Sequence, residues 1–369
     1  MALLASAHAA LLAGNTDAAS AELDRAEGMS HSADTEVLQV LALMQRGQYQ
    51  RAVAYAAHAA GAHLDVWQAL ALHAWLLAVG EQREHASSQV TAALRRHPDD
   101  PGLLALQSRL QTLQPLAQPA ALPNVNPNAN PKANPADLPV GPISTGTFVP
   151  ANVVMVATGL LLDGSRTVLV PLRALQGATS IWVRSSLGAA RAATIMRWVD
   201  SANVYANAIA GAGTGMALLT LTEPLTLPPQ HPGLLRAPAD AFAGSPGHVV
   251  GMLPSPEAAP AWPAMNTGFV GRITASGVQG LAIETARSLP GAPVFDRAGR
   301  WIGVVGASHG EASGNANRGK SLVPLTQLSS VLGDTLLAVP IAVNSANLTP
   351  ADTYERALPL VLQVMVLRD

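Results

Sequence analysis

Cysteine is absent from the 369 residues, and charged residues make up only 12% of them, with lysine at Lys132 and Lys320 alone. Without cysteine the chain has no disulfide framework, no thiolate metal site and no cysteine nucleophile. With a net charge of −2 it also lacks the concentrated basic face of a nucleic-acid-binding protein. No apolar run is long enough to span a bilayer, and the opening residues do not have the form of a signal peptide.

Hydrophobic residues, in contrast, make up 49% of the sequence, which is enough to build substantial cores. A chain of this length is expected to form more than one domain. The composition and the hydrophobic pattern change along the chain. These changes predict a helical region over 1–113, a linker over 114–142, a β domain over 143–337 and a tail over 338–369.

The helical region contains a repeat, because Gly14, Gly47 and Gly80 are spaced 33 residues apart and each precedes a polar stretch and an alanine-rich helix. Small residues recur in phase after these glycines, and a fixed period of this size is typical of a helical solenoid. The pattern resembles tetratricopeptide repeats, and an alanine-rich bundle is the alternative. Repeat arrays bind partners on a concave surface, to which we expect three side chains to point: Asp34, Gln45 and Trp67.

The linker has a proline at every fourth position from Pro115 to Pro139, with asparagine filling much of the rest. Proline removes backbone donors and disfavours helix before it, so the segment is predicted to be an extended, semi-stiff spacer. A docking strip for a partner is the alternative.

The β domain is predicted from short apolar runs that glycine and proline interrupt. Three strings in it carry a more specific signal: T-V-L-V-P-L-R-A-L-Q-G-A over 167–178, G-M-A-L-L-T-L over 215–221, and S-L-P-G-A-P-V-F-D-R-A-G-R-W-I-G-V over 288–304. In this order they resemble the histidine, aspartate and serine motifs of HtrA/Deg-type trypsin-like serine proteases. The resemblance implies an all-β, trypsin-like double β-barrel, and the chain as a whole is expected to be an α+β multidomain protein.

The same resemblance implies that the catalytic triad is degenerate. Arg173, Gly215 and Pro290 stand where the family has histidine, aspartate and serine, at spacings of 42 and 75 residues. Triad chemistry needs a hydroxyl, an imidazole and a carboxylate, and arginine cannot act as a base near neutral pH. Proline also removes a backbone N–H that would stabilise the oxyanion. We therefore predict an inactive homologue, a pseudoprotease, whose cleft can still bind a peptide, with Arg173 and Gly291 at its centre.

An enzyme with a relocated triad is the rival interpretation, and Ser288, His248 and His309 are its candidates. A structural part of an envelope or secretion assembly is a further alternative. We expect no cofactor, and no metal site, because among the helical histidines only His58 and His63 lie close in sequence.

The tail, with T-Y-E-R-A-L-P-L-V-L-Q-V-M-V over 353–366, resembles the short helix and first strand by which a trypsin-like domain begins. We expect it to start a second such domain, and an extra strand on the present barrel is the alternative. The resemblance, together with the lack of cysteine, favours a bacterial protein that works outside the cytoplasm, in the periplasm. Its expected partner is a protein or peptide.

Overall fold

The structure is a computed structural model that describes residues 2–112, 141–199, 215–254, 258–273, 279–283, 290–306, 321–342 and 346–368. It divides into two compact units. The helical unit consists of Met1–Phe148 with two short segments, Ser186–Ala190 and Ser255–Trp262, and the β unit consists of Val149–Ser185, Arg191–Pro254 and Pro263–Asp369. No helix among the described residues is both long and apolar enough to cross a membrane.

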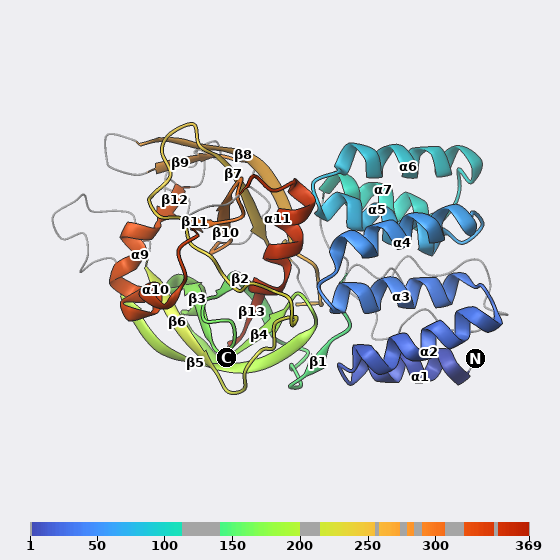
Figure 1. The fold of residues 1–369 in the computed structure, drawn as a ribbon, viewed down its shortest axis with the longest axis horizontal. Coiled ribbons are helices and arrows are strands. Elements are labelled where there is room, and N and C mark those ends of the chain that lie inside the picture. The colour runs from blue at the N-terminus through green and yellow to red at the C-terminus, as the bar shows by residue number, and fades with distance from the viewer. Residues whose placement is uncertain are drawn as a thin grey trace. The chain divides into compact units, whose positions relative to one another are not determined.

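The helical unit is a stack of antiparallel helix pairs (Figure 1). Its helices are α1 (Ala2–Leu12), α2 (Thr16–Met29), α3 (Ala33–Gln45), α4 (Tyr49–Ala62), α5 (Trp67–Val79), α6 (Arg83–Arg96) and α7 (Pro101–Thr112). The pairs α1 with α2, α3 with α4 and α5 with α6 make most of the contacts, and α7 packs on α5 and α6. Alanines at the predicted repeat positions, Ala19, Ala52 and Ala86, are fully buried and let the paired helices approach closely.

The turns inside the pairs explain the repeat. Gly14 and Gly47 have φ of +75° and +74°, a left-handed conformation that glycine adopts at little cost. In the third pair Glu81, with φ of +75°, takes this position, so the period lengthens by one residue there. Ala93 rather than Ala92 is accordingly the buried residue of the third repeat. At Gly80 the need for glycine is steric rather than conformational, because a Cβ there would lie 1.8 Å from the hydroxyl oxygen of Tyr49.

The predicted linker lies outside the described residues, except for Gly141 and Pro142. After it, β1 (Thr145–Gly146) pairs in parallel with Ala189 and Ala190.

The first barrel of the β unit is a ring of six strands in the order β5-β4-β13-β2-β3-β6, which a pairing of β5 with β6 closes. Its strands are β2 (Val154–Leu161), β3 (Thr167–Pro171), β4 (Ala178–Ser185), β5 (Ala189–Val199), β6 (Met216–Leu221) and β13 (Val361–Arg368). Leu161, Val168 and Leu219 are paired in register across β2, β3 and β6, so they share one face of the sheet, and all three are fully buried.

The tail contributes a strand to this first barrel. Strand β13 is antiparallel to both of its neighbours, with Leu362 opposite Gly159 of β2 and Ser185 of β4. The helix before it, α11 (Pro350–Ala357), begins with a capping box between Thr349 and Asp352. The segment 361–366 is buried along its whole length, as the alternative of an extra strand requires. That the tail also starts a second trypsin-like domain stays a prediction.

The second barrel is closed in the order β10-β11-β12-β9-β8-β7. Its strands are β7 (Pro246–Gly251), β8 (Ala264–Ile273), β9 (Gln279–Ala282), β10 (Pro293–Asp296), β11 (Trp301–Val305) and β12 (Ser321–Pro324). Its core includes Val249, Val270, Val294, Ile302 and Leu322. Helices α9 (Leu325–Leu332) and α10 (Asp334–Ala338) follow it, and the short 3-10 turns η2 (Leu172–Leu175) and η4 (Leu358–Leu360) complete the unit.

The predicted fold class, an N-terminal helical array followed by a trypsin-like double β-barrel, is thus confirmed. The finer identification of the array as tetratricopeptide repeats stays a prediction.

Removing apolar contacts from β13 is expected to destabilise the first barrel. Leu362→Ala should cost about 2–5 kcal/mol of unfolding free energy, because the side chain is fully buried, and hydrogen exchange in β2 and β4 should accelerate. The matched control is Leu337→Ala on α10, where the leucine is 73% exposed and the cost should stay within about 0.5 kcal/mol. Unchanged exchange in β2 and β4 would mean that β13 is not a strand of this barrel.

Candidate functional site

The first two triad positions lie side by side at one end of the first barrel. Arg173 is exposed in η2, which follows β3 directly, and Gly215 immediately precedes β6. Strands β3 and β6 pair with Pro171 opposite Met216, and the N–H of Leu172 donates to the Gly215 carbonyl at 3.0 Å. The ladder therefore places the two positions together, as the triad alignment requires, without an imidazole or a carboxylate at either.

The third position meets the same end of that barrel. Pro290 precedes β10, and its carbonyl accepts a hydrogen bond of 3.0 Å from the N–H of Thr158 on β2. Gly291 has φ of +88°, and a Cβ on it would lie 2.4 Å from the Thr158 carbonyl oxygen and 2.6 Å from Cδ of Pro171. The backbone at 290–291 is therefore packed directly onto β2 and the end of β3.

Pro171 links the three positions, because it touches Gly291, pairs with Met216 and lies two residues before Arg173. The junction of the two barrels is thus made of backbone and ring contacts. The N–H of Gly291 donates to the Val305 carbonyl at 3.1 Å, and Pro290 has no N–H, so neither residue presents a free donor to an oxyanion. Thr158 also ties the barrels together through its hydroxyl, which accepts from the N–H of Met252 at 3.0 Å.

Of the candidates for a relocated triad, only His248 lies in the described residues; Ser288 and His309 lie outside them. His248 is 4% exposed on β7, where it pairs with Phe295 across the sheet. Its Nδ1 is 2.7 Å from the hydroxyl of Thr267 on β8. This histidine is therefore buried on the face of β7 opposite to the core residue Val249, and a neighbouring strand holds its ring.

The three array residues predicted to face a partner do not share a surface. Asp34 is exposed in the first turn of α3, and partial burial raises the pKa of its carboxyl. Gln45 instead donates from Nε2 to the Leu11 carbonyl at 3.1 Å and so caps the end of α1. Trp67 is only 7% exposed and lies against Gly102 of α7. The expectation of an exposed Trp67 is corrected, because α7 covers this side of the array.

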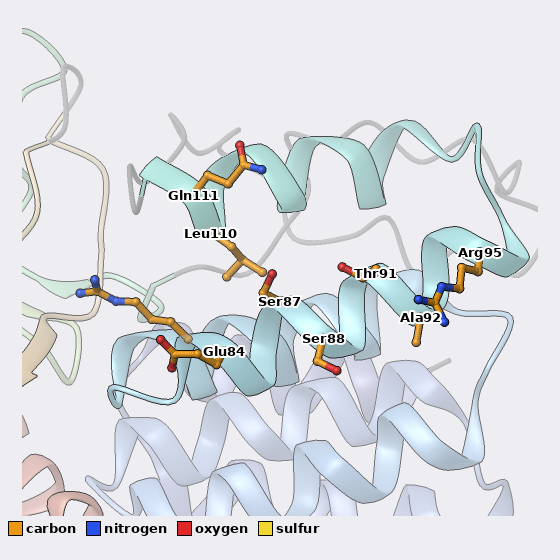
Figure 2. Close-up of a pocket in the computed structure, with 9 residues that line it drawn as sticks. Glu84, Ser87, Ser88, Thr91, Ala92, Arg95, Leu110 and Gln111 are labelled. Atoms are coloured by element: carbon orange, nitrogen blue, oxygen red, sulfur yellow. The ribbon is translucent and has the colours of Figure 1, made fainter.

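A groove that sequence reasoning missed lies between α6 and α7 (Figure 2). It has a volume of about 570 Å³. Ser87 of α6 and Leu110 of α7 point toward one another across it. Most of the residues that line it have a hydroxyl, amide or charged group: Arg83, Glu84, Ser87, Ser88, Thr91, Arg95 and Gln111. The signal in the sequence was α6, which contains serine, threonine, glutamine and arginine among its alanines.

One cluster in the helical unit has metal-ligating side chains. His31, Glu36 and His63 hold one ligand atom each within 4.8 Å of one another, and His58 Nε2 lies 3.3 Å from the same carboxylate. Their positions along the chain differ by up to 32 residues, so proximity in sequence does not reveal them.

Comparison with known proteins shows a similarity of fold and nothing about activity. No protein-family model matches the sequence, and no curated protein matches it. The Rv3671c protease of M. tuberculosis H37Rv, as an inactive serine-to-alanine mutant, is 17% identical, with 52% of this chain and 90% of that chain covered and a TM-score of 0.35. Kallikrein-related peptidase 10 is also 17% identical, with 49% and 92% covered and a TM-score of 0.35. At such values no activity follows from the likeness.

Filling the junction at Gly291 is expected to destabilise the β unit. Gly177 is the matched control, since its φ is +69° but nothing lies within 4 Å of a Cβ built on it. Gly177→Ala should cost about 1–2 kcal/mol for the left-handed backbone, and Gly291→Ala about 1–3 kcal/mol more, because its Cβ meets rigid backbone and a proline ring. Denaturant unfolding measures both. An equal loss of unfolding free energy in the two variants would show that the backbone around Gly291 has room for a methyl group.

Proposed function

We propose that this protein is a non-catalytic binding protein, in which the helical unit recruits a protein partner and the β unit is an inactive trypsin-like barrel pair. The observation that carries the proposal is the convergence of Arg173, Gly215 and Pro290 at one junction. An error of alignment would scatter these positions. Their convergence supports the alignment, and with it the absence of all three catalytic groups.

The junction gives a second argument. Catalysis of acyl transfer depends on preorganised N–H donors that point to the developing oxyanion. At 290–291 one donor is missing and the other is committed to Val305. Restoring a nucleophile alone would therefore not restore the electrostatic part of catalysis.

The helical unit supports the binding role through the groove between α6 and α7. A cavity of about 570 Å³ is within the range of ligand sites. Its hydroxyls, its amide and the arginines suit the backbone and acidic side chains of a peptide segment. In the β unit, exposed Arg173 makes no ion pair with any other described residue and can pair with a carboxylate of a peptide that binds at this end of the barrel.

A bacterial, extracytoplasmic setting is part of the proposal. It is supported by the resemblance of the three motifs to HtrA/Deg-type proteases and by the absence of cysteine.

Activity measurements test the proposal directly. The purified chain is expected to show no labelling by a fluorophosphonate probe and no cleavage of casein, under conditions in which trypsin shows both. Labelling at a single serine, abolished by replacing that serine with alanine, would falsify the proposal and make the protein a peptidase with unorthodox residues.

Binding at the groove is tested with peptides selected from a random library on the intact chain. Thr91→Trp places a large side chain in the groove, so it should weaken binding of the selected peptides by at least ~10-fold, a loss of about 1.4 kcal/mol. His85→Trp is the control, because His85 is exposed on the same helix but does not line the groove. Peptides that lose affinity equally in both variants, or in neither, would argue against this groove as the recruiting surface.

A further inference from the structure

Glu36 is a buried carboxylate whose oxygens lack hydrogen-bond partners among the described residues. It lies in the first turn of α3, its side chain is 0% exposed, and neither carboxylate oxygen accepts a hydrogen bond from a described residue. Burying a carboxylate without compensation is costly, so such groups are paired or coordinate a metal. The neighbours of Glu36 are imidazole nitrogens: His31 Nε2 at 2.9 Å from Oε1, His58 Nε2 at 3.3 Å from Oε1, and His63 Nε2 at 3.3 Å from Oε2.

The backbone holds each of these groups in place. His31 lies between the end of α2 and Ser32, whose side chain caps α3 by accepting from the N–H of Thr35. His63 caps the end of α4, where its N–H donates to the Ala59 carbonyl at 3.0 Å. His58 is on the last turns of α4, with its ring centroid 6.2 Å from that of Tyr55.

The repeat explains why His31 and His63 meet. His63 and His97 are the C-cap residues of α4 and α6, and His31 comes one residue after Ser30, the C-cap of α2. Stacking of the repeats brings His63 beside His31, with ring centroids 5.4 Å apart. The positions of α5 and α6 that correspond to Glu36 and His58 are Leu70 and Ala92, so the ligand set is not repeated around His97.

The donor geometry matches that of a small divalent ion. Zinc binds imidazole nitrogen and carboxylate oxygen at about 2.0–2.2 Å in a tetrahedral arrangement, which puts neighbouring ligand atoms about 3.3–3.5 Å apart. The contacts of 2.9–3.3 Å to the Glu36 oxygens are close to that spacing. His63 Nε2 is buried and makes no hydrogen bond with a described residue, as expected of a lone pair that is directed at a shared centre. The negative end of the α4 dipole at His63 also favours a cation.

We propose that His31, Glu36 and His63, completed by His58, bind one Zn²⁺ per chain and clamp α3, α4 and the loop before α3 together. The ion neutralises the charge of Glu36. It also links α3 to α4, where the small alanine side chains of the helices supply little packing. This site is separate from the barrel junction and from the groove, and it stands whether or not the proposed function does.

Zinc binding is measured on the full chain, freed of metal with EDTA and titrated with ZnCl₂ by calorimetry. One ion per chain is expected, with a rise in thermal stability that EDTA reverses. Cobalt(II) in place of zinc should give the visible absorption of a tetrahedral site. Replacing a residue that only hydrogen-bonds to a metal ligand weakens metal binding by ~10–100-fold. Since Glu36 and His63 are proposed as ligands themselves, Glu36→Gln and His63→Ala should each weaken zinc binding by at least ~100-fold.

Two comparisons separate loss of the site from loss of the fold. Glu36→Gln removes a buried charge, so the metal-free variant should be at least as stable as the metal-free parent while its stability no longer responds to zinc. His97→Ala removes the histidine at the same repeat position and should leave zinc affinity unchanged. The proposal is overturned if zinc affinity survives both Glu36→Gln and His63→Ala, if His97→Ala lowers it as much as they do, or if no zinc binds.

Discussion

Closure of the first barrel by β13 is the constraint on which the β unit depends. Strand β13 pairs along its whole length with β2 and β4, about 200 residues away in the chain, and without it both would be open edges. Closure also fixes β2, whose Thr158 donates its N–H to the Pro290 carbonyl and accepts at its hydroxyl from the N–H of Met252. The junction around Pro290 therefore depends on a strand from the C-terminal part of the chain.

At that junction, around Gly291 and Pro171, the contacts are made by backbone atoms and a proline ring. In an active protease the same place must leave room for a hydroxyl, an imidazole and a substrate carbonyl. Here Gly291 is packed on Thr158 and Pro171 so closely that even a methyl group does not fit. Tight packing between the barrels favours a rigid frame, and a rigid frame suits a protein that presents a surface rather than one that turns over a substrate.

The helical unit combines residues that recur in each repeat with residues that occur in one repeat alone. Glycines in phase turn the chain, alanines in phase let the helices pack, and two histidines after successive second helices meet across a repeat boundary. The candidate binding sites come from residues that the repeats do not share. Glu36 appears in one repeat only, and polar residues of α6 line a groove beside α7. A regular scaffold with irregular side chains is how repeat proteins commonly acquire binding sites.

The sequence by itself determined the helical array and the β domain, and it predicted the three triad positions, because periodicity and ordered motifs are local properties of the chain. Tertiary structure alone decided three other matters. It turned the tail, similar to an entry strand, into the closing strand of the first barrel; it buried Trp67 under α7; and it gathered Glu36 with histidines from two repeats. Each depends on which distant segment packs against which, and no local pattern encodes that choice.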